Sequence, residues 1–199
     1  MEKAALRRTL LHQRRSLPAE AVRARSERIC QHLAATPTFA QAQAILAYFS
    51  TRQEPDLSPL FECHPDRNWG FPRCVGDRLY WHWWQPGDAC QVGAYGICEP
   101  HPDLPACDPS AADLILVPAV ACDARGYRLG YGGGFYDRCL SSPALAAIPT
   151  VGIAFDFACP QVLPTDPWDR PLSGVCTEAG WRVPLAGSQA AGGGDRSAR

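Results

Sequence analysis

The residues with the clearest chemical potential lie between Arg128 and Arg138, where the sequence reads RLGYGGGFYDR. Glycine leaves its backbone N–H group uncovered and readily adopts positive φ, so successive amides can converge on an anion. The two arginines add positive charge beside such an anion, and Asp137 adds the carboxylate oxygen that a divalent metal prefers. The segment therefore indicates a phosphate site with an adjoining metal, although a glycine run alone is more often a flexible turn.

The segments around the glycine run favour the phosphate interpretation. Leu114 to Pro118 is an apolar run without polar alternation, which is typical of a strand buried on both faces of an α/β sheet. A polar turn at residues 123–126 follows it, and residues 135–140 are compatible with a helix. Loop amides would then lie near a helix start, which favours phosphate. The spacing of the glycines matches neither the P-loop motif nor the glycine motif of dinucleotide-binding proteins, and the kinase motifs are absent.

Charged residues elsewhere could reach the same site. Residues 2–15 predict a helix on which Lys3 and Arg7 share a face, and Arg14 extends that basic line. Glu54 comes just past a predicted strand, at the edge where open α/β sheets bind ligands. Both features also have plain structural explanations, because basic helix faces are often solvated and Glu is common at helix N-termini.

Strands and helices alternate along the chain. We expect helices at residues 2–15, 16–34, 57–61 and 135–140, and strands at 44–49, 69–75, 78–84, 114–118 and 149–155. This order predicts the α/β class, with a three-layer, mostly parallel central sheet and helices on both faces of a single domain. Residues 1–185 would form that domain, and the Gly-, Ala- and Ser-rich residues 186–199 would form a disordered tail.

Several local expectations accompany this fold. Ser16 is placed to cap the second helix, and Pro72 to interrupt the strand at 69–75. Residues 104–112, with their prolines and aspartates, are expected to form a loop. The aromatic residues at 78–84 favour packing in the core over a stacking platform.

Composition excludes several classes of protein. The chain has 199 residues and a net charge of −1, so no broad surface for nucleic acid or membrane is expected. Its 10 cysteines are scattered without C-x-x-C, and its 5 histidines show no metal-binding spacing. The first residues lack the apolar core of an export signal, which indicates a cytoplasmic protein with reduced thiols. We expect a monomer with small-molecule partners.

Four motifs together resemble one known family. The pattern R-L-G-x-G-x-G-[YF]-Y-D is met at residues 128–137, and K-x-x-[LI]-R at Lys3 to Arg7. A Glu after the first strand is met by Glu54, and G-I-x-E-P by residues 96–100. The chain resembles the 5-formyltetrahydrofolate cyclo-ligases, also called methenyltetrahydrofolate synthetases, from about residue 3 to 178. It departs from their pattern at Pro55 and Leu57, and at Ser173, where the family carries Asp.

The resemblance implies an ATP- and Mg²⁺-dependent conversion of 5-formyltetrahydrofolate to 5,10-methenyltetrahydrofolate through a phosphorylated formyl group. It implies ATP contacts from Lys3, Arg7, Arg128, Leu129, Gly130, Tyr131, Gly132, Gly133, Gly134, Phe135 and Tyr136. It implies folate contacts from Phe49, Glu54, Tyr131, Gly132, Gly133, Gly134 and Phe135. Arg128 and Tyr136 would be catalytic, and Asp137 would bind Mg²⁺. Two alternatives stay open: a non-catalytic folate- or nucleotide-binding protein on the same fold, and a different ATP-dependent ligase or kinase.

Overall fold

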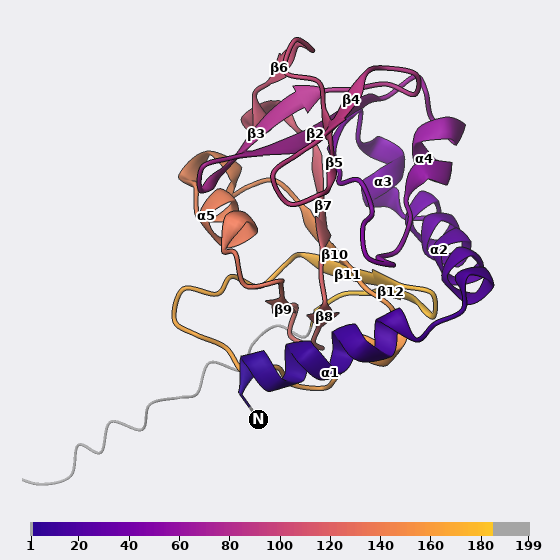
Figure 1. The fold of residues 1–199 in the computed structure, drawn as a ribbon, viewed down its shortest axis with the longest axis vertical. Helices are drawn as coiled ribbons and strands as arrows, with labels where there is room; N and C mark the ends of the chain where they lie inside the picture. Colours follow the sequence, from indigo (N-terminus) through magenta and orange to yellow (C-terminus); the bar gives the residue numbers. More distant parts are fainter. Residues whose placement is uncertain (1, 185–199) are drawn as a thin grey trace, which may run out of the picture.

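The apolar run forms strand β7 (Leu114–Pro118), in the middle of an eight-stranded sheet (Figure 1). The computed structural model describes residues 2–184. The strand order is β12-β11-β10-β7-β1-β2-β3-β6. The other strands are β1 (Ala44–Leu46), β2 (Asn68–Val75), β3 (Arg78–Trp83), β6 (Ala106–Cys107), β10 (Thr150–Ile153), β11 (Gly174–Thr177) and β12 (Gly180–Arg182). Strands β2, β1, β7, β10 and β11 are parallel, and antiparallel strands extend both edges.

Helices cover both faces of this sheet, which explains why β7 is apolar at successive positions. Leu114 and Leu116 belong to a core shared with α2 (Ala19–Ala34), α3 (Pro37–Gln41) and α4 (Ser58–Cys63). Ile115 and Val117 belong to the opposite core, against which α5 (Phe135–Leu140) and the 3-10 turn Pro143–Leu145 pack. Alternate side chains of a strand point to opposite faces, so a strand covered on both sides has no polar position. The predicted α/β class with three layers is confirmed.

Helix α1 (Lys3–Arg15) lies across the end of the molecule that also holds the hairpin of β8 (Ala121–Cys122) and β9 (Arg128–Leu129) (Figure 1). Leu10 of the helix packs in a third core with Leu129 of β9. A second hairpin, β4 (Cys90–Val92) and β5 (Cys98–Pro100), contacts β2, where Glu99 Oε1 accepts a 2.9 Å hydrogen bond from the Cys74 N–H. No helix within residues 2–184 is long and apolar enough to cross a membrane.

Three local predictions were wrong. Ser16 caps no helix start, because its hydroxyl donates back to Gln13 O at 2.7 Å and Pro18 occupies the cap position of α2. Pro72 does not interrupt β2, which runs through it opposite Trp81. The pairing with β1 ends at Gly70, so the missing N–H of this proline falls where β2 has an open side.

The expected loop at residues 104–112 was also wrong, because it contains β6 and a 3-10 turn, Pro109–Ala111. The strand expected at 44–49 ends at Leu46, and α3 and the β8–β9 hairpin were missed. The tail expected at 186–199 lies outside the described residues, so that prediction stands untested.

Candidate active site

One cavity of about 540 Å³ opens at the carboxyl ends of β1 and β7 and gathers the predicted site residues. It is lined by all of them: Lys3, Arg7, Phe49, Glu54, Arg128, Leu129, Gly130, Tyr131, Gly132, Gly133, Gly134, Phe135, Tyr136 and Asp137. These residues come from three distant parts of the chain. The fold therefore brings the basic helix, the acidic segment after β1 and the glycine loop to one place.

The glycine loop is an ordered turn whose conformation depends on glycine at two positions. Gly132 has φ of 100° and Gly134 has φ of 69°, both in the left-handed region. A Cβ on Gly134 would also lie 2.6 Å from Arg138 Nη1. Among the described residues, no acceptor pairs with the backbone N–H groups from Tyr131 to Asp137. This run of free donors along the cavity wall suits an anion with several oxygens.

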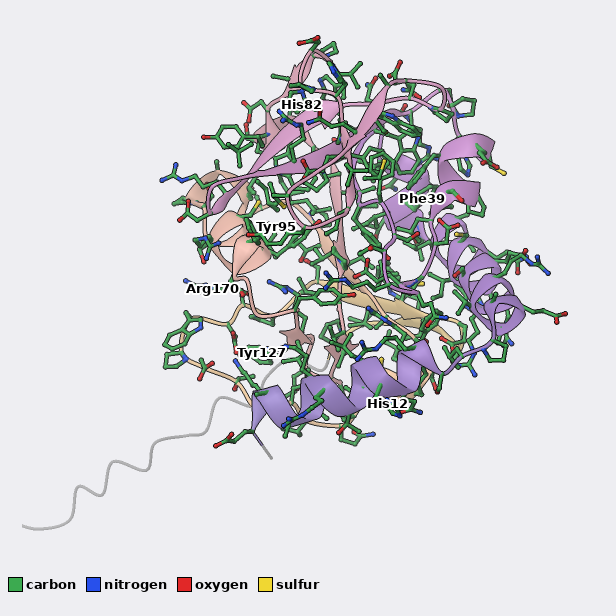
Figure 2. The ribbon with its side chains drawn as sticks, in the orientation of Figure 1. His12, Phe39, His82, Tyr95, Tyr127 and Arg170 are labelled. Atoms are coloured by element: carbon green, nitrogen blue, oxygen red, sulfur yellow. The ribbon has the colours of Figure 1, made fainter. Side chains whose placement is uncertain are left out.

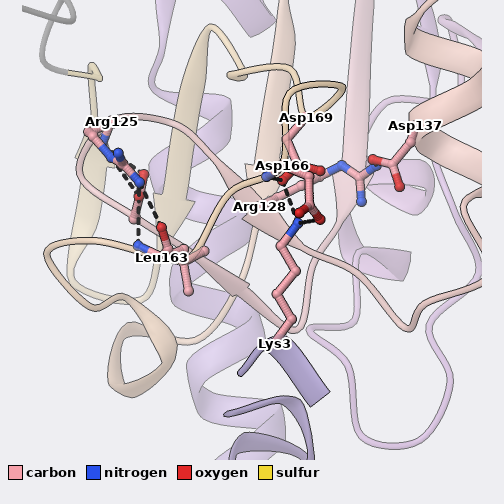
Figure 3. Close-up of polar contacts among 8 residues, drawn as sticks. Lys3, Arg125, Arg128, Asp137, Leu163, Asp166 and Asp169 are labelled. Carbon is pink, nitrogen blue, oxygen red and sulfur yellow. Dashed lines mark hydrogen bonds and ion pairs between the residues drawn. The ribbon is translucent and has the colours of Figure 1, made fainter. Parts of the chain in front are cut away.

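The turn that precedes the loop is fixed by a buried carboxylate. Asp123 accepts hydrogen bonds from the backbone N–H groups of Arg125, Tyr127 and Leu163 at 2.9, 3.0 and 2.9 Å. The Arg125 guanidinium closes the arrangement by donating to Leu163 O at 2.8 Å (Figure 3). The polar turn expected at 123–126 thus sets the position of β9, from which Arg128 projects.

Arg128 is the most enclosed cation of the cavity wall. Its side chain is 6% exposed, and its Nη2 lies 2.5 Å from Asp137 Oδ1. The guanidinium also lies 5.7 Å from the centre of the Tyr136 ring. The Tyr136 hydroxyl is buried and has no hydrogen-bond partner among the described residues, and burial raises its pKa well above the usual value. The tyrosine is therefore held neutral, with a hydroxyl free to donate to a bound molecule.

Arg7 and Lys3, on the basic face of α1, make different contacts. Arg7 Nε donates to Gly130 O at 2.7 Å and so fastens the helix to the glycine loop. Lys3 Nζ lies 2.6 Å from Asp166 Oδ2 and 2.5 Å from Asp169 Oδ2 (Figure 3). Burial lowers the pKa of Lys3, but its hydrogen bonds to the two carboxylates outweigh that effect and raise the pKa overall. The ammonium is therefore charged and stands at the cavity edge.

Glu54 lines the same cavity and is buried among polar groups. Its side chain accepts the Thr51 N–H at 3.0 Å. The Tyr131 hydroxyl accepts a bond from Arg14, and the charges of Glu54 and Arg14 both act on that hydroxyl. Burial raises the pKa of Glu54, and the charge of Arg14 opposes that rise. Arg52, just before it, has φ of 49°, a strained conformation typical of functional loops.

We expect Arg14→Gln to raise the pKa of the Glu54 carboxyl further, because the nearby positive charge that favours its ionised form would be lost. The carboxyl ¹³C shift of Glu54, followed by NMR against pH, measures this directly. Arg14→Lys should restore most of the original value, since it keeps the charge. Arg8→Gln removes an exposed charge from the same helix and should leave it unchanged. An unshifted midpoint in Arg14→Gln would disprove the coupling.

Aromatic side chains form the apolar wall beside Glu54. Phe49 stacks on the buried Phe71 with ring centres 4.1 Å apart and planes 8° apart. At the mouth, the half-exposed Tyr95 meets Phe135 edge-on at 5.6 Å. In the aromatic run at 78–84, Trp81 is buried in the core as expected, whereas Tyr80 is 53% exposed.

Metal binding by side chains alone has little support. Among residues 2–184, no group of three or more His, Cys, Asp or Glu side chains is placed to hold a metal ion. His12 on α1 and His82 on β3 lie at opposite ends of the molecule (Figure 2). Asp137 offers one partly exposed carboxylate on the cavity wall, which fits Mg²⁺ bound mainly by phosphate and water. Ser173 lies at the amino end of β11, where it bonds Thr150, and does not line the cavity.

Sequence reasoning missed several residues of the cavity wall. Asp166 and Trp168 lie on the connection after β10, where no periodicity marks them. Asp169 lies on the same connection, and Glu99 is a buried carboxylate from the β5 hairpin. The G-I-x-E-P motif was the only signal for Glu99. The pairing of Lys3 with Asp166 and Asp169 spans almost the whole chain and left no local signature.

The fold and the cavity define an α/β protein in which a glycine loop with free backbone N–H groups lines the same cavity as a buried carboxylate. A family model described as the 5-formyltetrahydrofolate cyclo-ligase family matches residues 1–178. The chain belongs to that family.

Named relatives agree with this assignment. The chain is 30% identical over 175 residues to the 5-formyltetrahydrofolate cyclo-ligase of Escherichia coli K12, covering 82% of this chain and 93% of that one. It is 39% identical over 100 residues to the enzyme of that name from Mycolicibacterium smegmatis, covering half of each chain. The NMR structure of Aquifex aeolicus 5,10-methenyltetrahydrofolate synthetase matches with a TM-score of 0.81 and 32% identity, over 99% of this chain and 100% of that one. A Mycoplasma pneumoniae structure of the same name, 23% identical with a TM-score of 0.73, supports the fold; it covers 89% of this chain and 99% of that one.

Proposed function

We propose that this protein converts 5-formyltetrahydrofolate to 5,10-methenyltetrahydrofolate, with ATP converted to ADP and phosphate. The observation that carries the proposal is that the glycine loop and Glu54 line one cavity, close enough that the Glu54 charge adds to burial in raising the pKa of Tyr131. The loop and the buried carboxylate are thus adjacent, so an anionic chain and a hydrogen-bonding ring system would meet there. The name of the family supplies the folate substrate, and the free N–H groups of the glycine loop support ATP as the second substrate.

The chemistry explains why a cyclisation needs ATP. The formyl oxygen on N5 attacks the γ-phosphorus, ADP leaves, and the oxygen becomes part of a phosphate ester. N10 then attacks the activated formyl carbon and loses its proton to solvent, and the carbon–oxygen bond breaks to release phosphate as the ring closes. Phosphorylation converts a poor leaving oxygen into a good one.

The glycine loop and the nearby cations would hold the phosphates. The free N–H groups from Tyr131 to Asp137 provide donors, and Arg128, Arg7 and Lys3 provide positive charge. The unpartnered Tyr136 hydroxyl can donate to an oxygen of the transferring group. When bound, Mg²⁺ would neutralise phosphate charge, and Asp137 would hold it through its carboxylate.

The region around Glu54 would hold the folate. A buried carboxylate accepts N–H groups strongly when it is ionised, and the pterin ring presents several such donors. Phe49 offers a flat apolar face beside it. Holding both substrates in register could supply several of the about 7–11 kcal/mol available from proximity.

We expect Asp137→Asn to raise the Mg²⁺ concentration needed for half-maximal turnover by about tenfold, because one charged ligand becomes neutral. Turnover measured across a Mg²⁺ series at saturating ATP gives this value. Asp77→Asn removes a carboxylate that does not line the main cavity and serves as the matched control. An unchanged Mg²⁺ requirement in Asp137→Asn would remove it as a ligand.

The proposed reaction is tested by following methenyltetrahydrofolate absorbance after mixing the protein with ATP, Mg²⁺ and 5-formyltetrahydrofolate. We expect absorbance to rise in proportion to the ADP formed. Binding of both ligands without an absorbance change would indicate a non-catalytic binding protein. ATP binding without folate binding would indicate a different ATP-dependent ligase or kinase.

A further inference from the structure

The Tyr131 side chain of the glycine loop is contacted by two arginines from distant parts of the chain. The guanidinium of Arg14 lies 5.4 Å from the centre of the tyrosine ring, and it also donates a hydrogen bond to the hydroxyl. The guanidinium of Arg52 lies 5.8 Å from the same ring centre. A cation within about 6 Å of the centre of an aromatic ring is attracted by that ring. Helix α1, the glycine loop and the segment after β1 therefore meet at Tyr131.

Arg14 is buried, yet it forms no ion pair among the described residues. It is 3% exposed, and its Nε has no hydrogen-bond partner there. A buried charge is costly unless it is paired, so an ion pair does not account for the position of this side chain. Its hydrogen bond goes to Tyr131, which packs against the third core together with Leu10 of the same helix. Helix α1 thus holds the tyrosine side chain in place.

Arg52 reaches the ring from a strained turn at residues 51–54. Arg52 has φ of 49° and Gln53 has φ of 59°, and no other residue except glycine has positive φ within residues 2–184. Such conformations persist only where the surrounding contacts enforce them. Here Thr51 N–H donates to Glu54 Oε2 at 3.0 Å, and Glu54 N–H donates to Thr51 O at 2.9 Å. The Gln53 side chain donates to the connection between α1 and α2 at 3.2 Å. The turn therefore fixes the Glu54 carboxylate and the contact with the tyrosine together.

Arg52 differs from the other cations that line the cavity. Lys3, Arg7 and Arg128 each donate to a carboxylate or a backbone carbonyl group. Arg52 is exposed, and among the described residues its guanidinium has no ion pair. Its cation–π contact with Tyr131 is therefore the interaction that joins its turn to the glycine loop.

We infer that Arg52 is a positioning residue which, through the Tyr131 ring, couples anion binding at the glycine loop to folate binding at Glu54. The inference rests on the proposed function and adds a link between its two substrates. An anion held by the free N–H groups from Tyr131 onward fixes the tyrosine, and the fixed ring holds Arg52 and the turn that carries Glu54. Because this turn is then ordered before folate arrives, each substrate should bind more tightly in the presence of the other.

Calorimetry measures this link as the ratio of two dissociation constants for 5-formyltetrahydrofolate, the first without and the second with a saturating β,γ-imido analogue of ATP and Mg²⁺. For the unaltered protein we expect a ratio of at least about five, the lower end of typical couplings between two sites. Arg52→Ala should lower this ratio by about 2- to 5-fold, the effect of losing one exposed cation–π contact, and should change the affinity for the analogue alone by less than about twofold.

Controls separate this effect from others of the same substitution. Burial raises the pKa of Glu54 and the charge of Arg52 opposes that rise, so losing the charge would weaken folate binding with and without the analogue alike; the ratio isolates the coupling. Arg52→Lys keeps a cation over the ring and should recover most of the ratio. Arg8→Ala removes an exposed arginine of α1 that does not line the cavity and should leave the ratio unchanged. Since Arg52 is exposed, its alanine variant should keep the melting temperature of the unaltered protein.

A second substitution tests whether the link depends on the ring. Tyr131→Leu keeps an apolar side chain against the third core and should lower the ratio as Arg52→Ala does. Combining the two substitutions should then lower it no further. The inference is overturned, with the proposed reaction intact, by equal folate affinities with and without the analogue, by an unchanged ratio in Arg52→Ala, or by additive losses in the double variant. If the unaltered protein fails to bind one or both ligands, the proposed function fails, and the inference fails with it.

Discussion

Arg128→Ala is expected to lower kcat/KM by about 10- to 150-fold, the effect of losing one charge-assisted hydrogen bond worth about 1.5–3 kcal/mol. Arg128 is the enclosed cation at the phosphate end of the cavity, and its guanidinium also orients Asp137. The loss should fall mainly on kcat, because charge on the transferring oxygens develops during the reaction. Steady-state kinetics with ATP and 5-formyltetrahydrofolate varied separately measure both parameters.

Two further variants sharpen this prediction. Arg128→Lys keeps the charge and loses the planar fork, so it should recover only part of the activity. Arg28→Ala removes an exposed arginine of α2 that does not line the cavity and should behave as the unaltered protein. Near-normal turnover in Arg128→Ala would end its assignment to the phosphates.

Glu54→Gln is expected to weaken 5-formyltetrahydrofolate binding by about 10- to 150-fold and ATP binding by less than about twofold. The carboxylate is buried, with 4% of the residue exposed, so a bond that it makes to an N–H of the ligand is protected from water. Binding of each ligand alone, measured by calorimetry, separates the two effects. Glu27→Gln alters an exposed carboxylate and provides the control. A larger loss for ATP than for folate would reverse the assignment.

The same carboxylate gives the unaltered protein a dependence on pH. Burial raises the pKa of Glu54, and under the proposed function the ionised form would accept N–H groups from the folate. Folate affinity should therefore be greatest above this raised pKa and fall as pH decreases through it. The fall should begin at a higher pH than an exposed Glu, with its pKa of about 4.3, would allow. In Glu54→Gln the dependence due to this group should disappear.

The sequence predicted those parts of the protein that depend on local pattern. The buried strand β7, the helix α1 and the glycine loop each carry a signal within about fifteen residues, because side-chain periodicity and glycine content act locally. The two-residue strands β8 and β9 are too short to show any period. The uninterrupted course of β2 through Pro72 depends on where its neighbour β1 ends, which only the assembled sheet determines.

The same distinction, between local sequence signals and long-range contacts, applies to the candidate site. All residues expected from motifs line one cavity, but the contacts between them join distant segments. Arg14, Tyr131 and Glu54 form one network although α1, the glycine loop and the segment after β1 lie far apart in sequence. Asp166 and Asp169 form ion pairs with Lys3, and Trp168 lies between them in the sequence. All three residues belong to a connection whose sequence has no regular pattern. Packing, and not propensity, sets these contacts.

The central claim is that phosphate is transferred to the formyl oxygen at the junction of the glycine loop and the folate region. The most direct test uses 5-formyltetrahydrofolate labelled with ¹⁸O in the formyl group, with mass analysis of the phosphate released during turnover with unlabelled ATP. We expect one ¹⁸O atom in each phosphate, because the formyl oxygen leaves the carbon bonded to phosphorus. Unlabelled phosphate, with the ¹⁸O recovered in water, would contradict the account.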